Sequence, residues 1–126
     1  MKRFTEDVEK WINKQRSILE SQKQKKILIV EGFRMLAYKP LAQLFDKKYF
    51  ITISEAVCKE RRRVYVPPDV PGYMDKVVWP EYLNHLRELK QETNIEYIDG
   101  TEDQDAVKEK ILQNIFQFLD TKISNI

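Results

Sequence analysis

The feature that most constrains the fold is a series of three short apolar runs, separated by segments with helical periodicity. The runs are 27–30, 49–53 and 95–98. The first run contains no polar residue, which is typical of a strand covered on both faces. Because strands that alternate with helices form right-handed βαβ units, the sequence predicts an α/β fold with a parallel sheet flanked by helices. We expect one domain over residues 1–126, with about three strands.

The segments between the runs begin with residues suited to the start of a helix. Serine and threonine side chains accept hydrogen bonds from the first turn, and proline fits there because it lacks the N–H group. The first helix is expected over residues 4–20, and the last opens with a capping box at 101–104. A polar loop at 21–26 and a loop at 65–80, which holds four of the five prolines, are also predicted. The residues expected at the four helix starts are Thr5, Ser54, Pro80 and Thr101.

Composition excludes several classes of protein. The 22 basic and 20 acidic residues leave a net charge of +2, which is too small to indicate nucleic-acid binding by itself. No apolar run approaches the roughly 18 residues of a membrane span. Cys58 is the only cysteine and His85 the only histidine, so neither a disulfide framework nor a cysteine–histidine metal site is expected. A single cysteine fits a reducing compartment, and we expect the cytoplasm, with the nucleus as a second location.

Glycine is scarce in this chain. The three glycines are Gly32, Gly72 and Gly100. The phosphate-binding loop of many nucleotide kinases requires the motif G-x-x-x-x-G-K-[ST], which these 126 residues do not contain. We therefore expect that residues 1–126 do not hold a nucleotide by that route.

Glu31 directly follows the first apolar run and precedes Gly32. Ligands of open α/β sheets gather at the carboxyl ends of the strands, where an acid can hold a magnesium ion or its water shell. A glutamate that ends a strand and faces solvent, or caps a neighbouring helix, is the more frequent case. The sequence pattern by itself leaves both interpretations open.

Residues 59–63 place four cations within five residues at the expected end of a helix. Such a run is usually a solvated helix end whose charge complements the helix dipole. Guanidinium groups also bind phosphate oxygens in pairs and stabilise charge during phosphoryl transfer. Tyr65, Tyr73 and Trp79 lie in the proline-rich loop that follows, so this loop fits either a lid over a small aromatic ligand or an ordinary ordered loop.

Several motifs together resemble the nicotinamide riboside kinases. The most distinctive is V-Y-x-P-P-D-x-P-G-Y at residues 64–73. The resemblance spans residues 26–101 and extends loosely over both flanking helices. The other matching motifs are I-L-I-V-E-G-F at 27–33, Y-K-P-L at 38–41, V-W-P at 78–80 and D-G-T at 99–101.

The resemblance implies a P-loop kinase that transfers the γ-phosphate of ATP, with Mg²⁺, to the 5′-hydroxyl of nicotinamide riboside. The product would be nicotinamide mononucleotide for NAD synthesis, and the partner a small-molecule riboside rather than a membrane. The resemblance also implies a lid over residues 59–80 and places Glu31 near the magnesium ion. The implied ATP contacts are Arg61, Arg63, Val64, Tyr65, Glu102, Asp103 and Gln104. The implied riboside contacts are Arg62, Tyr65, which would stack on the pyridine ring, and Val66.

The sequence departs from that family in three respects. The family begins with a strand, the P-loop and an aspartate that acts as general base, none of which is among these 126 residues. We therefore expect a C-terminal portion of such a kinase, truncated before these elements and inactive by itself. In the family, the strand that leads into the P-loop lies between the strands that match residues 27–30 and 49–53. Without it, each of these two runs is expected to lack a neighbouring strand. The spacing between Arg62 and Arg63 is shorter by two residues, and Val66 replaces a commonly polar residue.

Other functions compete with this one. A non-catalytic interaction protein on a kinase scaffold would use its exposed sheet edges to pair with a partner chain. A fragment of a uridine-type nucleoside kinase would share the fold, but the motif at 64–73 favours the nicotinamide riboside branch. Nucleic-acid binding through residues 59–63 ranks last, because the net charge is only +2.

Overall fold

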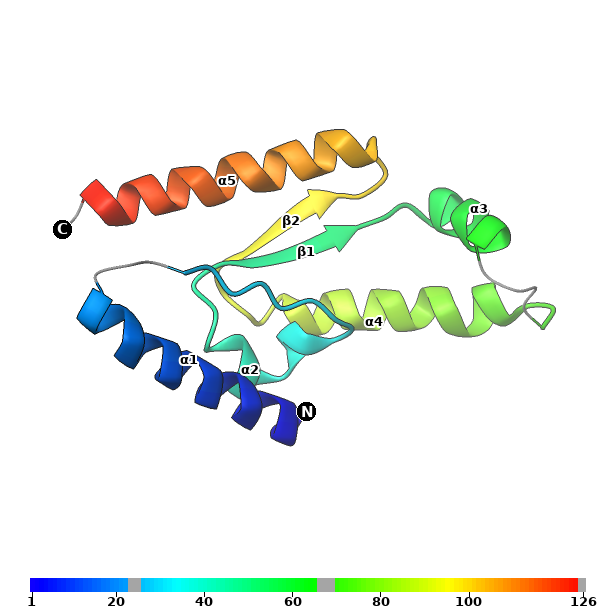
Figure 1. The fold of residues 1–126 in the computed structure, drawn as a ribbon. Coiled ribbons are helices and arrows are strands. Elements are labelled where there is room, and N and C mark those ends of the chain that lie inside the picture. Colours follow the sequence, from blue (N-terminus) through cyan, green and yellow to red (C-terminus); the bar gives the residue numbers. More distant parts are fainter. Residues whose placement is uncertain (23–25, 66–69, 125–126) are drawn as a thin grey trace. The chain divides into compact units, whose positions relative to one another are not determined.

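The computed structural model describes residues 1–22, 26–65 and 70–124, and its helices and strands are drawn in Figure 1. The chain divides into two compact units, each made of two stretches that are distant in sequence. Unit 1 comprises Met1–Lys48 and Glu81–Asn94, and unit 2 comprises Tyr49–Pro80 and Ile95–Ile126. None of the helices in the described residues is both long and apolar enough to cross a membrane.

Unit 1 is helical. It contains α1 (Lys2–Gln22), the short 3₁₀ helix η1 (Met35–Ala37), α2 (Lys39–Ala42) and most of α4 (Trp79–Leu89). The helix predicted at 4–20 is confirmed, but it starts earlier than expected. Thr5 is not its cap, because the Thr5 hydroxyl donates to the Met1 carbonyl at 2.8 Å from inside the first turn. The buried apolar side chains of unit 1 are Val8, Leu41, Ala42 and Leu89.

The strand predicted at 27–30 does not form, so the expectation of three strands is wrong for the described residues. Residues 26–32 have no regular secondary structure, and Ile27 and Ile29 are 56% and 77% exposed. A strand is held by hydrogen bonds to a neighbouring strand. The sheet in the described part of the chain consists of two other strands only, so this apolar run has no ladder partner there.

Unit 2 carries the sheet. Its strands are β1 (Lys48–Thr52), whose first residue belongs to unit 1, and β2 (Ile95–Asp99), and they lie side by side and parallel (Figure 1). The strands predicted at 49–53 and 95–98 are thus confirmed. The helices of this unit are α3 (Glu55–Tyr65), the π-helical segment η2 (Met74–Val78) and α5 (Gln104–Ser124). A parallel sheet flanked by helices agrees with the predicted α/β class.

The two faces of this sheet have different neighbours. On one face, the Tyr49 hydroxyl donates to Asn114 Oδ1 of α5, and Asn114 Nδ2 donates to Glu96 Oε1 at 2.9 Å. Burial, and secondarily the negative charge of Glu96, raises the pKa of Tyr49. On the other face, the rings of Phe50 and Tyr97 meet edge to face with centroids 6.0 Å apart. The side chains of alternate residues in each strand therefore point to opposite faces of the sheet.

The described part of the proline-rich region starts at residue 70 and contains a turn. Val70, Pro71, Gly72 and Tyr73 form a turn in which the Tyr73 N–H donates to the Val70 carbonyl at 2.9 Å. Gly72 has φ +81°, the conformation that a type II turn requires at its third residue. Helical structure begins at Met74 and η2 continues directly into α4 at Trp79, so Pro80 lies inside the first turn as predicted.

Candidate functional site

The carboxyl ends of β1 and β2 lie next to each other in unit 2, and the segments that follow are joined by hydrogen bonds. The Gly100 N–H donates to the Thr52 carbonyl at 2.7 Å. The Ser54 N–H donates to the Thr101 hydroxyl at 3.2 Å, and the Thr52 hydroxyl donates to the Ile98 carbonyl at 3.3 Å. This is the edge at which parallel α/β sheets bind ligands, so it is the first candidate region.

Gly100 allows the two strand ends to approach this closely. A Cβ atom at this position would lie 2.4 Å from Ile51 Cγ2 and 2.8 Å from the Thr52 carbonyl oxygen. Both distances are shorter than side-chain carbons tolerate, and one neighbour is backbone. The glycine of the D-G-T motif is therefore required by the packing of the sheet edge.

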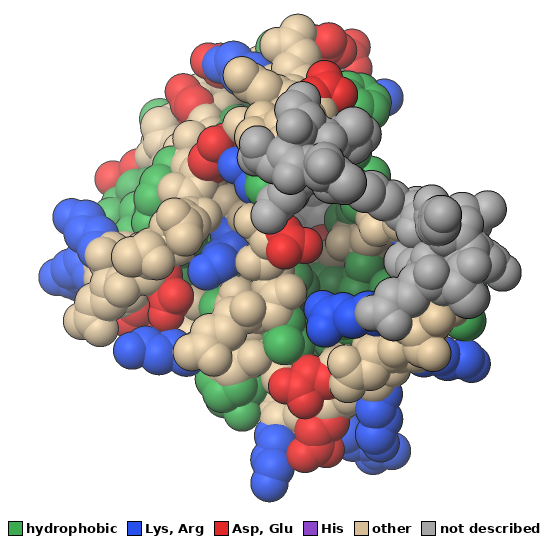
Figure 2. All heavy atoms as spheres, turned by 90° about the vertical axis from the view of Figure 1, so that its left-hand side faces the viewer, with side chains coloured by type: hydrophobic (Ala, Val, Ile, Leu, Met, Phe, Trp, Pro, Cys, Tyr) green, Lys and Arg blue, Asp and Glu red, His purple; other side chains and the backbone are tan. Residues whose placement is uncertain are grey.

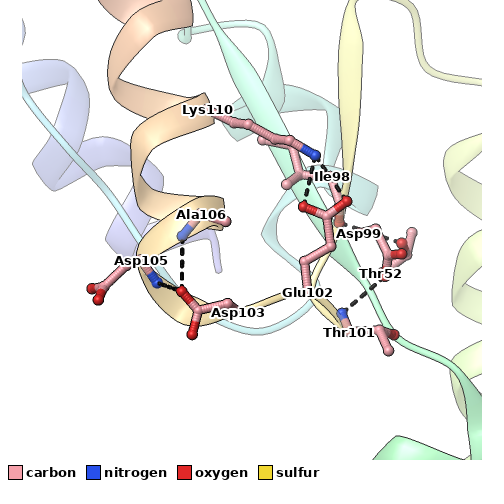
Figure 3. A network of polar contacts seen from close by, with 9 residues as sticks. All are labelled: Thr52, Ile98, Asp99, Thr101, Glu102, Asp103, Asp105, Ala106 and Lys110. Carbon is pink, nitrogen blue, oxygen red and sulfur yellow. Dashed lines mark hydrogen bonds and ion pairs between the residues drawn. The ribbon is translucent and has the colours of Figure 1, made fainter.

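The loop between β2 and α5 is ordered by two aspartates (Figure 3). Asp99 Oδ1 accepts from the Thr101 N–H at 2.8 Å, and this hydrogen bond lowers the pKa of Asp99. Asp103 Oδ2 accepts from the N–H groups of Asp105 and Ala106 at 3.2 and 3.4 Å. Asp103 is therefore the N-cap of α5, which starts at Gln104.

The capping box predicted at 101–104 is wrong. Thr101 does not cap α5, because its hydroxyl accepts from the Ser54 N–H across the sheet edge. A sequence pattern cannot distinguish a threonine that caps its own helix from one that joins two loops. The cap two residues later satisfies the first turn of α5 instead.

The three residues implied as adenine contacts, 102–104, lie at the start of α5. The Glu102 carboxylate pairs with Lys110 Nζ at 2.7 Å, with 40% of the Glu102 side chain exposed (Figure 3). The Asp103 carboxylate caps the helix, as described above. Both acids thus have structural tasks within the loop, whereas Gln104 is exposed at the first helical position.

Helix α3 carries the basic run and follows β1 directly. Its predicted cap is confirmed, because the Ser54 hydroxyl oxygen accepts from the Val57 N–H at 3.3 Å. The arginines lie in its last two turns, and Arg61 stands roughly 10 Å along the helix axis from Ser54. Within the described residues, the β2–α5 loop is hydrogen-bonded to Ser54 at the start of the helix, at the opposite end from Arg61 and Arg63.

The cations of α3 have different surroundings. Arg63 pairs with Glu60 of the same helix at 2.6 Å, which raises the pKa of Arg63 and lowers that of Glu60. Arg61 is exposed. Arg62 is half-buried, with its guanidinium carbon 5.8 Å from the centroid of the Tyr73 ring. The basic run is therefore not one uniform patch. Figure 2 shows a different face of the molecule, on which the described basic and acidic side chains are also interspersed.

Lys59 connects α3 to the segment that follows the proline-rich turn. Its Nζ lies 2.7 Å from Asp75 Oδ1 and 3.3 Å from Glu55 Oε1. Hydrogen bonds to Asp75 first and Glu55 second raise the pKa of Lys59. The sequence analysis did not anticipate Asp75 as a partner of α3.

The remaining predicted residues can be placed as follows. Val64 is 58% exposed near the end of α3, and Tyr65 is the last residue of that helix. Val66 lies outside the described residues. Glu31 is exposed in unit 1 and does not end a strand, which corrects the basis of its predicted role. Within the described residues no three or more His, Cys, Asp or Glu side chains gather as a metal site.

Over 105 residues the chain is 43% identical to nicotinamide riboside kinase 1 of Rattus norvegicus, a match that covers 81% of this chain and 54% of that protein. The chain is a homologue of the nicotinamide riboside kinases. The chain is 42% identical over 103 residues to nicotinamide riboside kinase 1 of Homo sapiens, a match that covers 79% of this chain and 52% of that protein. It is 37% identical over 92 residues to nicotinamide riboside kinase 2 of Mus musculus, a match that covers 71% of this chain and 47% of that protein.

The resemblance inferred from the motifs is thereby confirmed. The chain spans about half the length of the nicotinamide riboside kinases it matches. No family model and no solved structure matches it.

Proposed function

We propose that this chain provides part of a nicotinamide riboside kinase, which phosphorylates the riboside with ATP and yields nicotinamide mononucleotide. The observation that carries the proposal is the 43% identity to nicotinamide riboside kinase 1 over 105 residues. The sheet edge at 99–104 supports the proposal, because parallel α/β folds bind ligands at this edge. A hydrogen bond from Ser54 to Thr101 joins this edge to the start of α3. We propose the cytoplasm as the site of the reaction.

We assign the end of α3 to the substrate-binding lid, over residues 59–80. Arg61, Arg63, Val64 and Tyr65 would face ATP, and Arg62, Tyr65 and Val66 the riboside. The charge of α3 supports this assignment, because guanidinium groups form paired hydrogen bonds with phosphate oxygens. Residues 102–104 would lie along the adenine.

The described residues do not by themselves fit a magnesium site. Glu31 is exposed, and no three ligating side chains gather in the described part of the chain. We therefore derive no step through the metal. The ATP phosphates are a different case, because the exposed guanidinium of Arg61 has the chemistry to bind them.

We further propose that a polypeptide consisting of residues 1–126 does not turn over substrate. Phosphoryl transfer depends on positioning and on charge stabilisation around the phosphates, and the P-loop motif that supplies both is not among these residues. The test is incubation of the purified 126-residue chain with Mg-ATP and nicotinamide riboside, followed by chromatography for the mononucleotide. Turnover well above background would refute the proposal.

Binding is tested separately from turnover. Calorimetric titration of the same chain with nicotinamide riboside should show a saturable signal that Arg62→Ala weakens. Glu60→Gln is the matched control, because it removes the charged partner of Arg63 on the same helix and leaves the Arg62 guanidinium in place. No saturable riboside signal at millimolar concentrations would contradict the assignment of the lid.

A second candidate function, a non-catalytic interaction protein, is favoured by the exposure of the apolar segment near residue 30. Ile27, Ile29 and Phe33 are 56%, 77% and 94% exposed. Such a segment can pair with a strand of another chain. Concentration-dependent self-association in sedimentation, abolished by Ile29→Lys, would support this function, whereas a monomer that binds the riboside would refute it.

A further inference from the structure

Two contacts join the same face of α3 to the start of η2. Lys59 and Arg62 are three residues apart on the helix and therefore point in similar directions. Their partners, Asp75 and Tyr73, are two residues apart at the other end of the proline-rich region. We call these four residues the α3–η2 clamp.

The partners in η2 are held in place by their own backbone. The type II turn at Gly72 ends at Tyr73, and the Lys76 N–H donates to the Gly72 carbonyl at 2.9 Å. Tyr73 precedes η2 directly and Asp75 lies in its first turn. A rigid turn therefore presents a ring and a carboxylate to α3 at a fixed spacing.

We infer that Tyr73 and Asp75 are positioning residues for Arg62: the Tyr73 ring attracts the guanidinium that lies over it, and the Lys59–Asp75 pair fixes the ring beside α3. This inference rests on the proposed function, in which Arg62 contacts the riboside. A guanidinium carries five N–H donors, and its attraction to an aromatic face uses its charge rather than these donors. The clamp thus orients Arg62 in advance.

The other arginines serve as an internal comparison. Arg63 is held by Glu60 of its own helix at 2.6 Å, a contact that does not involve η2. Arg61 is exposed on α3. If the clamp positions Arg62 specifically, changes in η2 should alter Arg62 and leave Arg61 and Arg63 as they are.

The decisive measurement is the side-chain Nε–H signal of each arginine in NMR spectra of the ligand-free 126-residue chain. Protons above an aromatic ring are shifted upfield, so the Arg62 signal should lie upfield of those of Arg61 and Arg63. Tyr73→Leu should abolish this shift, and Tyr73→Phe, which keeps the ring, should preserve it. Asp75→Asn should reduce it and Asp75→Glu should largely restore it. Circular dichroism of each variant confirms that the helices remain.

Glu60→Gln is the matched control in this experiment, because it removes an ion pair of similar length from the same helix and should move only the Arg63 signal. An Arg62 signal without the upfield shift, or one that Tyr73→Leu leaves unchanged, overturns the inference. This holds regardless of whether the chain binds nicotinamide riboside.

Titration with nicotinamide riboside separates the inference from the proposed function. Weakening of riboside binding by Tyr73→Leu, roughly two- to fivefold, with Tyr73→Phe close to wild type, supports both. The ring-current shift without any riboside binding refutes the proposed function but leaves the positioning of Arg62 established. Riboside binding that Tyr73→Leu does not weaken overturns the role of the clamp in binding.

Discussion

Replacing Gly100 by alanine tests the packing of the sheet edge directly. The new Cβ would lie 2.4 Å from Ile51 Cγ2, which is 1.0 Å short of the 3.4 Å at which ordinary contact begins. It would lie 2.8 Å from the Thr52 carbonyl oxygen, 0.6 Å short of the same limit. The Ile51 side chain is 53% exposed and can turn away, but the Thr52 carbonyl is backbone and accepts the Gly100 N–H at 2.7 Å.

The magnitude follows from these two contacts. Forced overpacking costs about 1–3 kcal/mol, and a weakened hydrogen bond adds about 0.5–1.5 kcal/mol. The lower entropy of the unfolded alanine chain offsets about 0.4–1 kcal/mol of this loss. We expect Gly100→Ala to lower the free energy of unfolding by about 2 kcal/mol, which is about a 30-fold change in the folding equilibrium.

The assay is urea unfolding of the 126-residue chain, followed by circular dichroism. Gly32→Ala is the matched control, because its nearest neighbour is the flexible end of the Met35 side chain, at 3.0 Å. This control should stay within about 0.5 kcal/mol of wild type. A free energy of unfolding for Gly100→Ala that is also within this range would show that the loops after β1 and β2 are not as close as described.

Three further predictions concern the core, the cap of α5 and the loop acid. Leu89→Ala should lower the free energy of unfolding by about 2–4 kcal/mol in the same urea assay, because Leu89 is fully buried and its removal leaves a cavity. Asp103→Ala should cost about 1 kcal/mol and Asp103→Asn less, since asparagine also accepts from the first turn; an equal loss for both would argue against the cap. Asp99 should titrate below its ordinary value of 3.8 in carbon-detected NMR, because its carboxylate accepts from Thr101. The stability it contributes is present above that pH and is lost as the pH falls through the lowered pKa; an ordinary titration would contradict the loop geometry.

Parts of this site could be predicted because they depend on local sequence. Ser54 follows an apolar run and precedes a helical pattern, which specifies an N-cap, and the structure places it there. The proline–glycine pair at 71–72 specifies a type II turn, because proline sets the second residue and glycine allows a positive φ at the third. Each of these features is decided within about four residues of chain.

The α3–η2 clamp could not be predicted, because its contacts join residues that are far apart in the sequence. Lys59 and Asp75 are 16 positions apart, and Arg62 and Tyr73 are 11 positions apart.

 Contacts at such distances depend on the route of the chain through the proline-rich region, which neither a charge run nor an aromatic spacing specifies. The same reason explains the error at Thr101, whose hydroxyl was assigned to its own helix although it accepts from Ser54, 47 residues away.

The strand predicted at 27–30 shows the difference between helices and strands most clearly. A helix satisfies its backbone N–H and C=O groups within itself, so the pattern at 4–20 was sufficient to predict α1. A strand satisfies these groups only through a neighbour, so an apolar run predicts the capacity to form a strand and not its formation. Residues 49–53 and 95–98 are each other's neighbours, and both form strands. Residues 27–30 have the most uniformly apolar sequence of the three runs, yet they have no regular structure in the described part of the chain. Whether a strand forms is determined by hydrogen bonding to a neighbouring strand, not by hydrophobicity.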